Sequence, residues 1–145
     1  MKQFATHGAE RSRHEWWAFE GFTHIDCCLV TDRTILFVEG KRTETVSPAT
    51  RWFEKRSQLW RNVEAAHQFA RGKQFAVILG VEQEGDGKAA LQEADARLHD
   101  SYPHLTDPER TTLSRHLLGL VTWPQVVRQF SLPATCLPNT VADVR

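Results

Sequence analysis

Three charged side chains in the first third of the chain could together carry out hydrolytic chemistry: Asp26, Glu39 and Lys41. Two carboxylates can hold a divalent metal ion that lowers the pKa of a bound water and neutralises the charge of a phosphate. A neighbouring lysine can orient that water or stabilise the negative charge that develops during the reaction. These residue types therefore point to the hydrolysis of a phosphodiester bond.

A β-hairpin would bring these side chains together. Segments 24–31 and 34–38 are apolar and β-prone, and the two residues 32–33 between them predict a tight turn. This turn places Asp26 directly opposite Glu39, with Lys41 on the same face, because side chains alternate along a strand. Opposed carboxylates destabilise a sheet. We expect Lys41 and a bound Mg²⁺ to relieve the repulsion, with the Gly40 carbonyl as a further ligand.

The rest of the chain alternates between helical and extended patterns. Segments 16–22 and 75–81 predict strands, and Gly72 follows a predicted helix at the position where helices commonly end. A capping box of Thr106 and Glu109, with Pro108 in the first turn, predicts the start of a later helix. The expected helices span about 54–71, 88–100 and 106–119, with a loop at 82–87 and a short helical segment opened by Trp123.

The chain resembles the PD-(D/E)XK, or restriction-endonuclease-like, superfamily. The motif here is Ile25-Asp26, then twelve residues, then Glu39-Gly40-Lys41. The resemblance implies an α/β fold with a central mixed four-stranded sheet flanked by helices, in the order αβββαβ. We expect a single domain over 1–145, divided into a nuclease-like core at 1–83, a C-terminal helical extension at 84–131 and a tail at 132–145.

The resemblance also implies further site residues. Family members often place a glutamine or a basic residue on the helix after the ExK strand, and Gln58 occupies that place, beside Asn62 on the same flank of the helix. Arg61 and Arg56 are the expected substrate contacts. An additional acidic metal ligand comes from the first helix in many members, and Glu15 or Glu20 could take this role, with Glu20 as the candidate metal ligand. The implied activity is a Mg²⁺- or Mn²⁺-dependent nuclease that acts on DNA rather than RNA, in a homodimer or larger complex.

Composition sets the limits on this hypothesis. The 145 residues fit one domain, and 18 basic residues balance 18 acidic ones. This neutral charge counts modestly against nucleic acid as a partner, because proteins that bind it through their overall field are usually basic. No apolar run is long enough to span a membrane and the first residues lack a signal-peptide core, so we expect a cytoplasmic protein. The three cysteines show no zinc-ligand spacing.

Three other hypotheses stay open. The chain could be a catalytically inactive nucleic-acid-binding or protein-interaction module of the same fold. It could be a subunit whose partner supplies the rest of a nucleic-acid surface. Finally, Asp26, Glu39 and Lys41 could form only a charged, salt-bridged end of the sheet.

Overall fold

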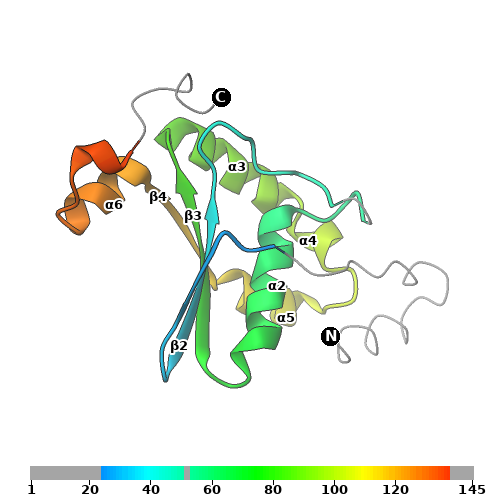
Figure 1. Ribbon diagram of the computed structural model, residues 1–145. Coiled ribbons are helices and arrows are strands. Elements are labelled where there is room, and N and C mark those ends of the chain that lie inside the picture. The colour runs from blue at the N-terminus through cyan, green and yellow to red at the C-terminus, as the bar shows by residue number, and fades with distance from the viewer. Residues whose placement is uncertain (1–23, 51–52, 138–145) are drawn as a thin grey trace.

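The fold is α/β and is built on one mixed sheet of four strands (Figure 1). The computed structural model describes residues 24–50 and 53–137, so the expected strand at 16–22 and Glu20 lie outside the described residues. The strands lie side by side in chain order, with β1 antiparallel to β2 and the other pairs parallel. In order, the elements are β1 (Cys27–Val30), β2 (Thr34–Gly40), α2 (Gln58–Ala70), β3 (Gln74–Val81), α3 (Glu84–Ala96), α4 (Leu98–Ser101), α5 (Asp107–Ser114), β4 (Leu117–Thr122), α6 (Trp123–Gln129) and a 3-10 turn (Ala134–Cys136).

The hairpin between β1 and β2 has the predicted register. Cys28 lies opposite Phe37 and Val30 lies opposite Ile35, as a turn at residues 32–33 requires. The turn closes through the Thr31 N–H, which donates to the Thr34 carbonyl at 2.8 Å. The predicted register is therefore confirmed for Cys27–Val30, and the Asp26–Glu39 pair of the site hypothesis would lie one position beyond it.

The two faces of the sheet are covered differently. Alternate residues of β2 face α2 and are buried, whereas those between them are half-buried. Phe37 packs against Phe69 of α2, with ring centroids 5.9 Å apart. Gly87 of α3 packs against the side chains of Val81 and Leu120, so α3 covers the same face as α2. Figure 1 shows α6 on the other side of the sheet from α2.

Helix α2 joins the parallel strands β2 and β3, and its apolar side forms much of the core. The buried residues Leu59, Val63 and Ala66 recur at helical spacing. The helix ends at Arg71 with φ of 47°, and Gly72 continues with φ of 91°, a backbone region where glycine carries no steric penalty. It begins four residues later than predicted, because a turn tied by Thr50 and Phe53 occupies the preceding segment.

Two further elements differ from the predictions. Helix α3 begins at Glu84, inside the expected loop, where Glu84 and Asp86 complement the positive end of the helix dipole. The expected helix over 106–119 starts with the predicted capping box but ends at Ser114, and β4 follows from Leu117. Gly119, with φ of 109°, lies where the pairing of β3 with β4 shifts register. Among the described helices, none is long and apolar enough to cross a membrane.

Candidate functional site

The predicted site lies at the carboxyl ends of the parallel strands. Glu39 and Lys41 stand at the end of β2, Glu82 directly follows β3, and Trp123 directly follows β4. Open α/β sheets commonly bind ligands outside this edge, where side chains from neighbouring strands converge. The topology therefore gathers residues that lie up to 84 positions apart in the chain.

Glu39 is a buried carboxylate held by three donors. Its side chain is 2% exposed and faces α2. Gln58 Nε2 donates to Oε1 at 2.6 Å, and Asn62 Nδ2 donates to Oε2 at 2.7 Å. The Lys41 ammonium also lies 2.6 Å from Oε1. A buried carboxylate is stable only when it is paired and hydrogen-bonded, and this one is both.

Lys41 connects the buried carboxylate with the surface. Its side chain is 18% exposed, while that of Glu39 is almost wholly covered. The backbone at Lys41 continues the sheet, since its N–H donates to the Gly80 carbonyl at 2.7 Å. The ammonium is therefore the part of this pair that can be reached from solvent.

Asp26 lies just before β1, and its side chain bonds to β2 at Gly40 rather than at Glu39. Its Oδ2 accepts the Gly40 N–H at 2.8 Å, so it caps an amide that lies just beyond the paired residues of the hairpin. The sequence hypothesis placed the two carboxylates face to face, and relieved their repulsion with Lys41 and a metal ion. In the structure Asp26 is instead held by the residue that follows Glu39.

Gln58 occupies the position that the resemblance implies, and it has two partners. Its Nε2 faces Glu39, while its Oε1 accepts the Ser47 N–H at 3.2 Å. The Gln58 N–H in turn donates to the Ser47 carbonyl at 3.2 Å. Gln58 therefore ties the segment after β2 to the start of α2 and aims its amide at Glu39.

The two expected substrate contacts are placed differently. Arg56 is 2% exposed, pairs with the buried Glu64 and lies over the ring of Tyr102. Its guanidinium is therefore part of the interior, where it cannot reach a substrate without unfolding this region. Arg61 is half-buried on α2, and its N–H donates to the Ser57 carbonyl.

Two residues of this region were not among the predicted site residues. Asn62 lies one helical turn after Gln58, and the four-residue spacing that puts both on one flank was the signal for it. Trp123 covers Gly40 from α6, and a methyl group built on Gly40 would lie 3.1 Å from its ring. Nothing in the local sequence signals this contact, because it joins residues 83 positions apart.

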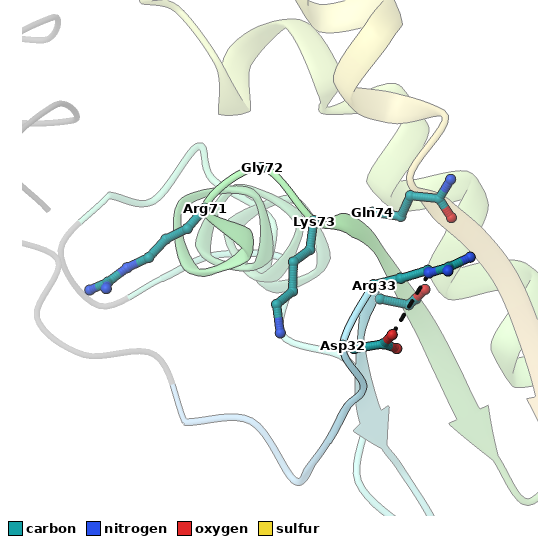
Figure 2. Close-up of a pocket in the computed structure, with 7 residues that line it drawn as sticks. Asp32, Arg33, Arg71, Gly72, Lys73 and Gln74 are labelled. Carbon is teal, nitrogen blue, oxygen red and sulfur yellow. Dashed lines mark ion pairs between the residues drawn. The ribbon is translucent and has the colours of Figure 1, made fainter.

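An open cavity lies at the other end of the sheet (Figure 2). Arg71 and Lys73 stand where α2 ends, a place where cations complement the negative end of the helix dipole. Lys73 Nζ also donates to the Thr31 carbonyl at 2.7 Å. Lys73 thus links the start of β3 to the end of β1. The lining residues are Asp32, Arg33, Thr34, Arg71, Gly72, Lys73 and Gln74.

The oxygen ligands available at the carboxyl end of the sheet are of the kind that a hard cation prefers. Carboxylate oxygens are the ligands that Mg²⁺ prefers. Oε1 of Glu39 already accepts from both Gln58 and Lys41. Oε2 of Glu39 and the Asp26 carboxylate, in contrast, retain lone pairs. Within the described part of the chain, no group of three His, Cys, Asp or Glu side chains could hold a metal. Mg²⁺ tolerates such a sparse set because it keeps several waters and takes substrate phosphates. Asp26 and Glu39 are thus two carboxylates here that could contribute to such a partial ligand set.

Comparison of the chain with protein-family models, with curated proteins and with solved structures found no match.

Proposed function

We propose that the protein is a Mg²⁺- or Mn²⁺-dependent nuclease of the PD-(D/E)XK type that hydrolyses phosphodiester bonds in DNA. The observation that supports this most is the contact of Lys41 with Glu39 at the carboxyl end of β2, backed by Gln58 and Asn62. Asp26 bonds to the amide of the residue between Glu39 and Lys41. The motif residues thus gather at one end of a mixed four-stranded sheet.

Each residue has a role that follows from its surroundings. Asp26 and Glu39, with the Gly40 carbonyl, would hold the metal. When bound, the metal supplies charge neutralisation and a more acidic water. Gln58 and Asn62 fix the orientation of the Glu39 carboxylate. Lys41, the more exposed member of the pair, orients the attacking water or stabilises the negative charge that develops on the phosphate.

The partner and assembly follow from the same proposal. DNA is the expected substrate, and a homodimer would present two sites for two strands. A formal charge of zero means that attraction to phosphates must come from local basic groups. We therefore expect cleavage to weaken as salt concentration rises.

Cleavage of plasmid and single-stranded DNA, with and without Mg²⁺ or Mn²⁺, tests the proposal. Glu39→Gln and Lys41→Met should each reduce the rate by at least about a hundredfold, because each removes a charge that acts on the reacting phosphate. Glu93→Gln is the matched control, since Glu93 is half-exposed on α3 and pairs with Arg97 of the same helical surface. Folded wild-type protein that cleaves neither DNA with either metal would refute the nuclease proposal.

One observation favours the inactive module of the same fold as a second candidate. Glu39 is 2% exposed, and both of its oxygens already have donors without a metal. An ion pair satisfied in this way can be purely structural. The two candidates separate in a thermal unfolding titration with Mg²⁺. A metal-dependent rise in Tm that disappears in Glu39→Gln supports a metal site, whereas no rise supports the inactive module.

A further inference from the structure

Trp123 covers a pair of glycines at the end of the sheet. Gly40 and Gly80 are partners in the pairing of β2 with β3. A methyl group built on Gly80 would lie 2.7 Å from the Trp123 ring, and one built on Gly40 would lie 3.1 Å from it. Any side chain at Gly80 would thus displace the indole. Two adjacent strands leave room for one aromatic ring at the place where the proposed site begins.

The same indole also bonds to the backbone of the site. Trp123 Nε1 donates to the Lys41 carbonyl at 3.2 Å, while the Lys41 N–H donates to the Gly80 carbonyl. The backbone of Lys41 is therefore held from both sides, by β3 and by the indole. Asp26 Oδ2 lies 3.6 Å from the point that a Gly40 methyl group would occupy, so the carboxylate and the ring flank the same residue.

Trp123 comes from a well-defined junction. It is the first residue of α6 and directly follows β4. A capping box of Thr122 and Gln125 fixes the start of the helix, and Pro124 occupies its first turn. The capped start of α6 thus fixes the position of the Trp123 ring, which contacts a backbone carbonyl 82 residues earlier in the chain.

We propose that Trp123 is a positioning residue that holds the Gly40–Lys41 backbone, and through it the Lys41 ammonium, in the geometry of the site. The expected effect on catalysis rests on the proposed nuclease function. The expected effect on the Gly40–Lys41 backbone rests on the contacts alone. It assigns to α6 the task of completing a site whose charged residues all come from the first half of the chain.

A double-mutant cycle with Gly80→Ala and Trp123→Ala tests the proposal. Gly80→Ala alone should push the indole away and raise amide exchange at Gly40 and Lys41 about tenfold or more. In a Trp123→Ala background the added methyl group meets no ring, so the same change should have almost no further effect. Gly85→Ala is the matched control, because a methyl group there meets nothing within 4 Å. Exchange is measured residue by residue by NMR, so it does not depend on nuclease activity.

Kinetics add the second readout. We expect Gly80→Ala to lower kcat by about tenfold to a hundredfold with little change in KM, because the substrate still binds while Lys41 is misplaced. Trp123→Phe keeps a ring over the glycines but lacks the N–H donor, and should recover most of the activity lost in Trp123→Ala, to within about fivefold of wild type.

Two results would overturn the proposal: additive effects of Gly80→Ala and Trp123→Ala, or exchange that rises equally in α5, which would show general destabilisation. If wild-type protein does not cleave DNA, the nuclease proposal fails, and the exchange measurements alone decide the role of Trp123.

Discussion

Two buried carboxylates, Glu39 and Glu64, contact helix α2 or the segment just before it, and they are held in different ways. Glu39 reaches the helix from β2, and Glu64 belongs to the helix itself. Their side chains are 2% and 9% exposed. Glu39 is held by one lysine and two neutral amides, whereas Glu64 lies between Arg56 and His104 Nε2, the latter at 3.1 Å. Burial is therefore similar, but the partners differ in kind.

The difference separates a closed charge cluster from an accessible one. The Arg56 and His104 side chains are each 2% exposed, so the Glu64 cluster is sealed between α2 and the α4–α5 region. Lys41, the cation at Glu39, is 18% exposed at the end of the sheet. Sealed ion pairs stabilise or specify a fold, while a buried carboxylate with an accessible cation can act on a ligand. This contrast supports a structural role for Glu64 and a functional one for Glu39.

Removal of the cation should produce the largest difference between the two clusters. We expect Arg56→Met to lower the free energy of unfolding by about 3–5 kcal/mol, because Glu64 then becomes a buried charge without its main counterion. Lys41→Met should cost only about 1–2 kcal/mol, because Gln58 and Asn62 still donate to Glu39. Urea denaturation of both variants measures the two values. Equal losses would show that the lysine is as structural as the arginine, and would weaken the functional assignment of Glu39.

Lowering the pH should reduce the free energy of unfolding through Glu64, by less than the loss expected for Arg56→Met. Burial by itself would raise the pKa of Glu64, but the Arg56 guanidinium and His104 outweigh it and hold this pKa below the ordinary value of 4.5. A carboxylate whose pKa is lower in the folded state contributes stability above its unfolded pKa and loses it as the pH falls through the folded one. We therefore expect the Glu64 contribution to be intact above about pH 5 and to decline below pH 4.5.

The pH dependence can be assigned with one substitution. Glu64→Gln removes the titrating group and should flatten the loss of unfolding free energy below pH 4.5, while it lowers stability at neutral pH. Glu93→Gln, on the surface of α3, is the control and should leave the slope nearly unchanged. A Glu64→Gln variant with the wild-type slope would mean that other carboxylates carry the acid sensitivity.

The parts of the fold that the sequence predicts well are those with local signals. The hairpin register follows from two apolar runs and a turn of two residues, and the capping box at Thr106 and Glu109 marks the start of α5. Strand β4 was not predicted, because Leu117, Leu120 and Val121 suit a helix as well as a strand. What makes this segment a strand is its pairing with β3, a contact across about forty residues.

The site shows the same division. Asp26, Glu39, Lys41 and Gln58 could be found from a motif and from helix spacing. Arg56 was expected to face a substrate because it lies among basic residues, but its burial depends on Glu64 and Tyr102, which arrive from later elements. Trp123 depends on a contact between β2 and α6 that no local pattern encodes. Tertiary contacts thus decide which charged and aromatic residues are structural.

A similarly small effect on stability is expected for a change at Gln58, and it tests the comparison of Glu39 with Glu64 most directly. Gln58→Ala removes one donor to Glu39 and the bond to the Ser47 N–H, and should cost about 1–2 kcal/mol in urea denaturation. If Glu39 were merely structural, as Glu64 is, nothing beyond this modest loss would follow. In a nuclease site the freed carboxylate would also lose its orientation, so DNA cleavage should fall by about tenfold or more at a temperature where the variant is fully folded. Gln129→Ala, at the exposed end of α6, is the control for the substitution itself. A Gln58→Ala variant that is destabilised but cleaves at the wild-type rate would place Glu39 in the same structural class as Glu64.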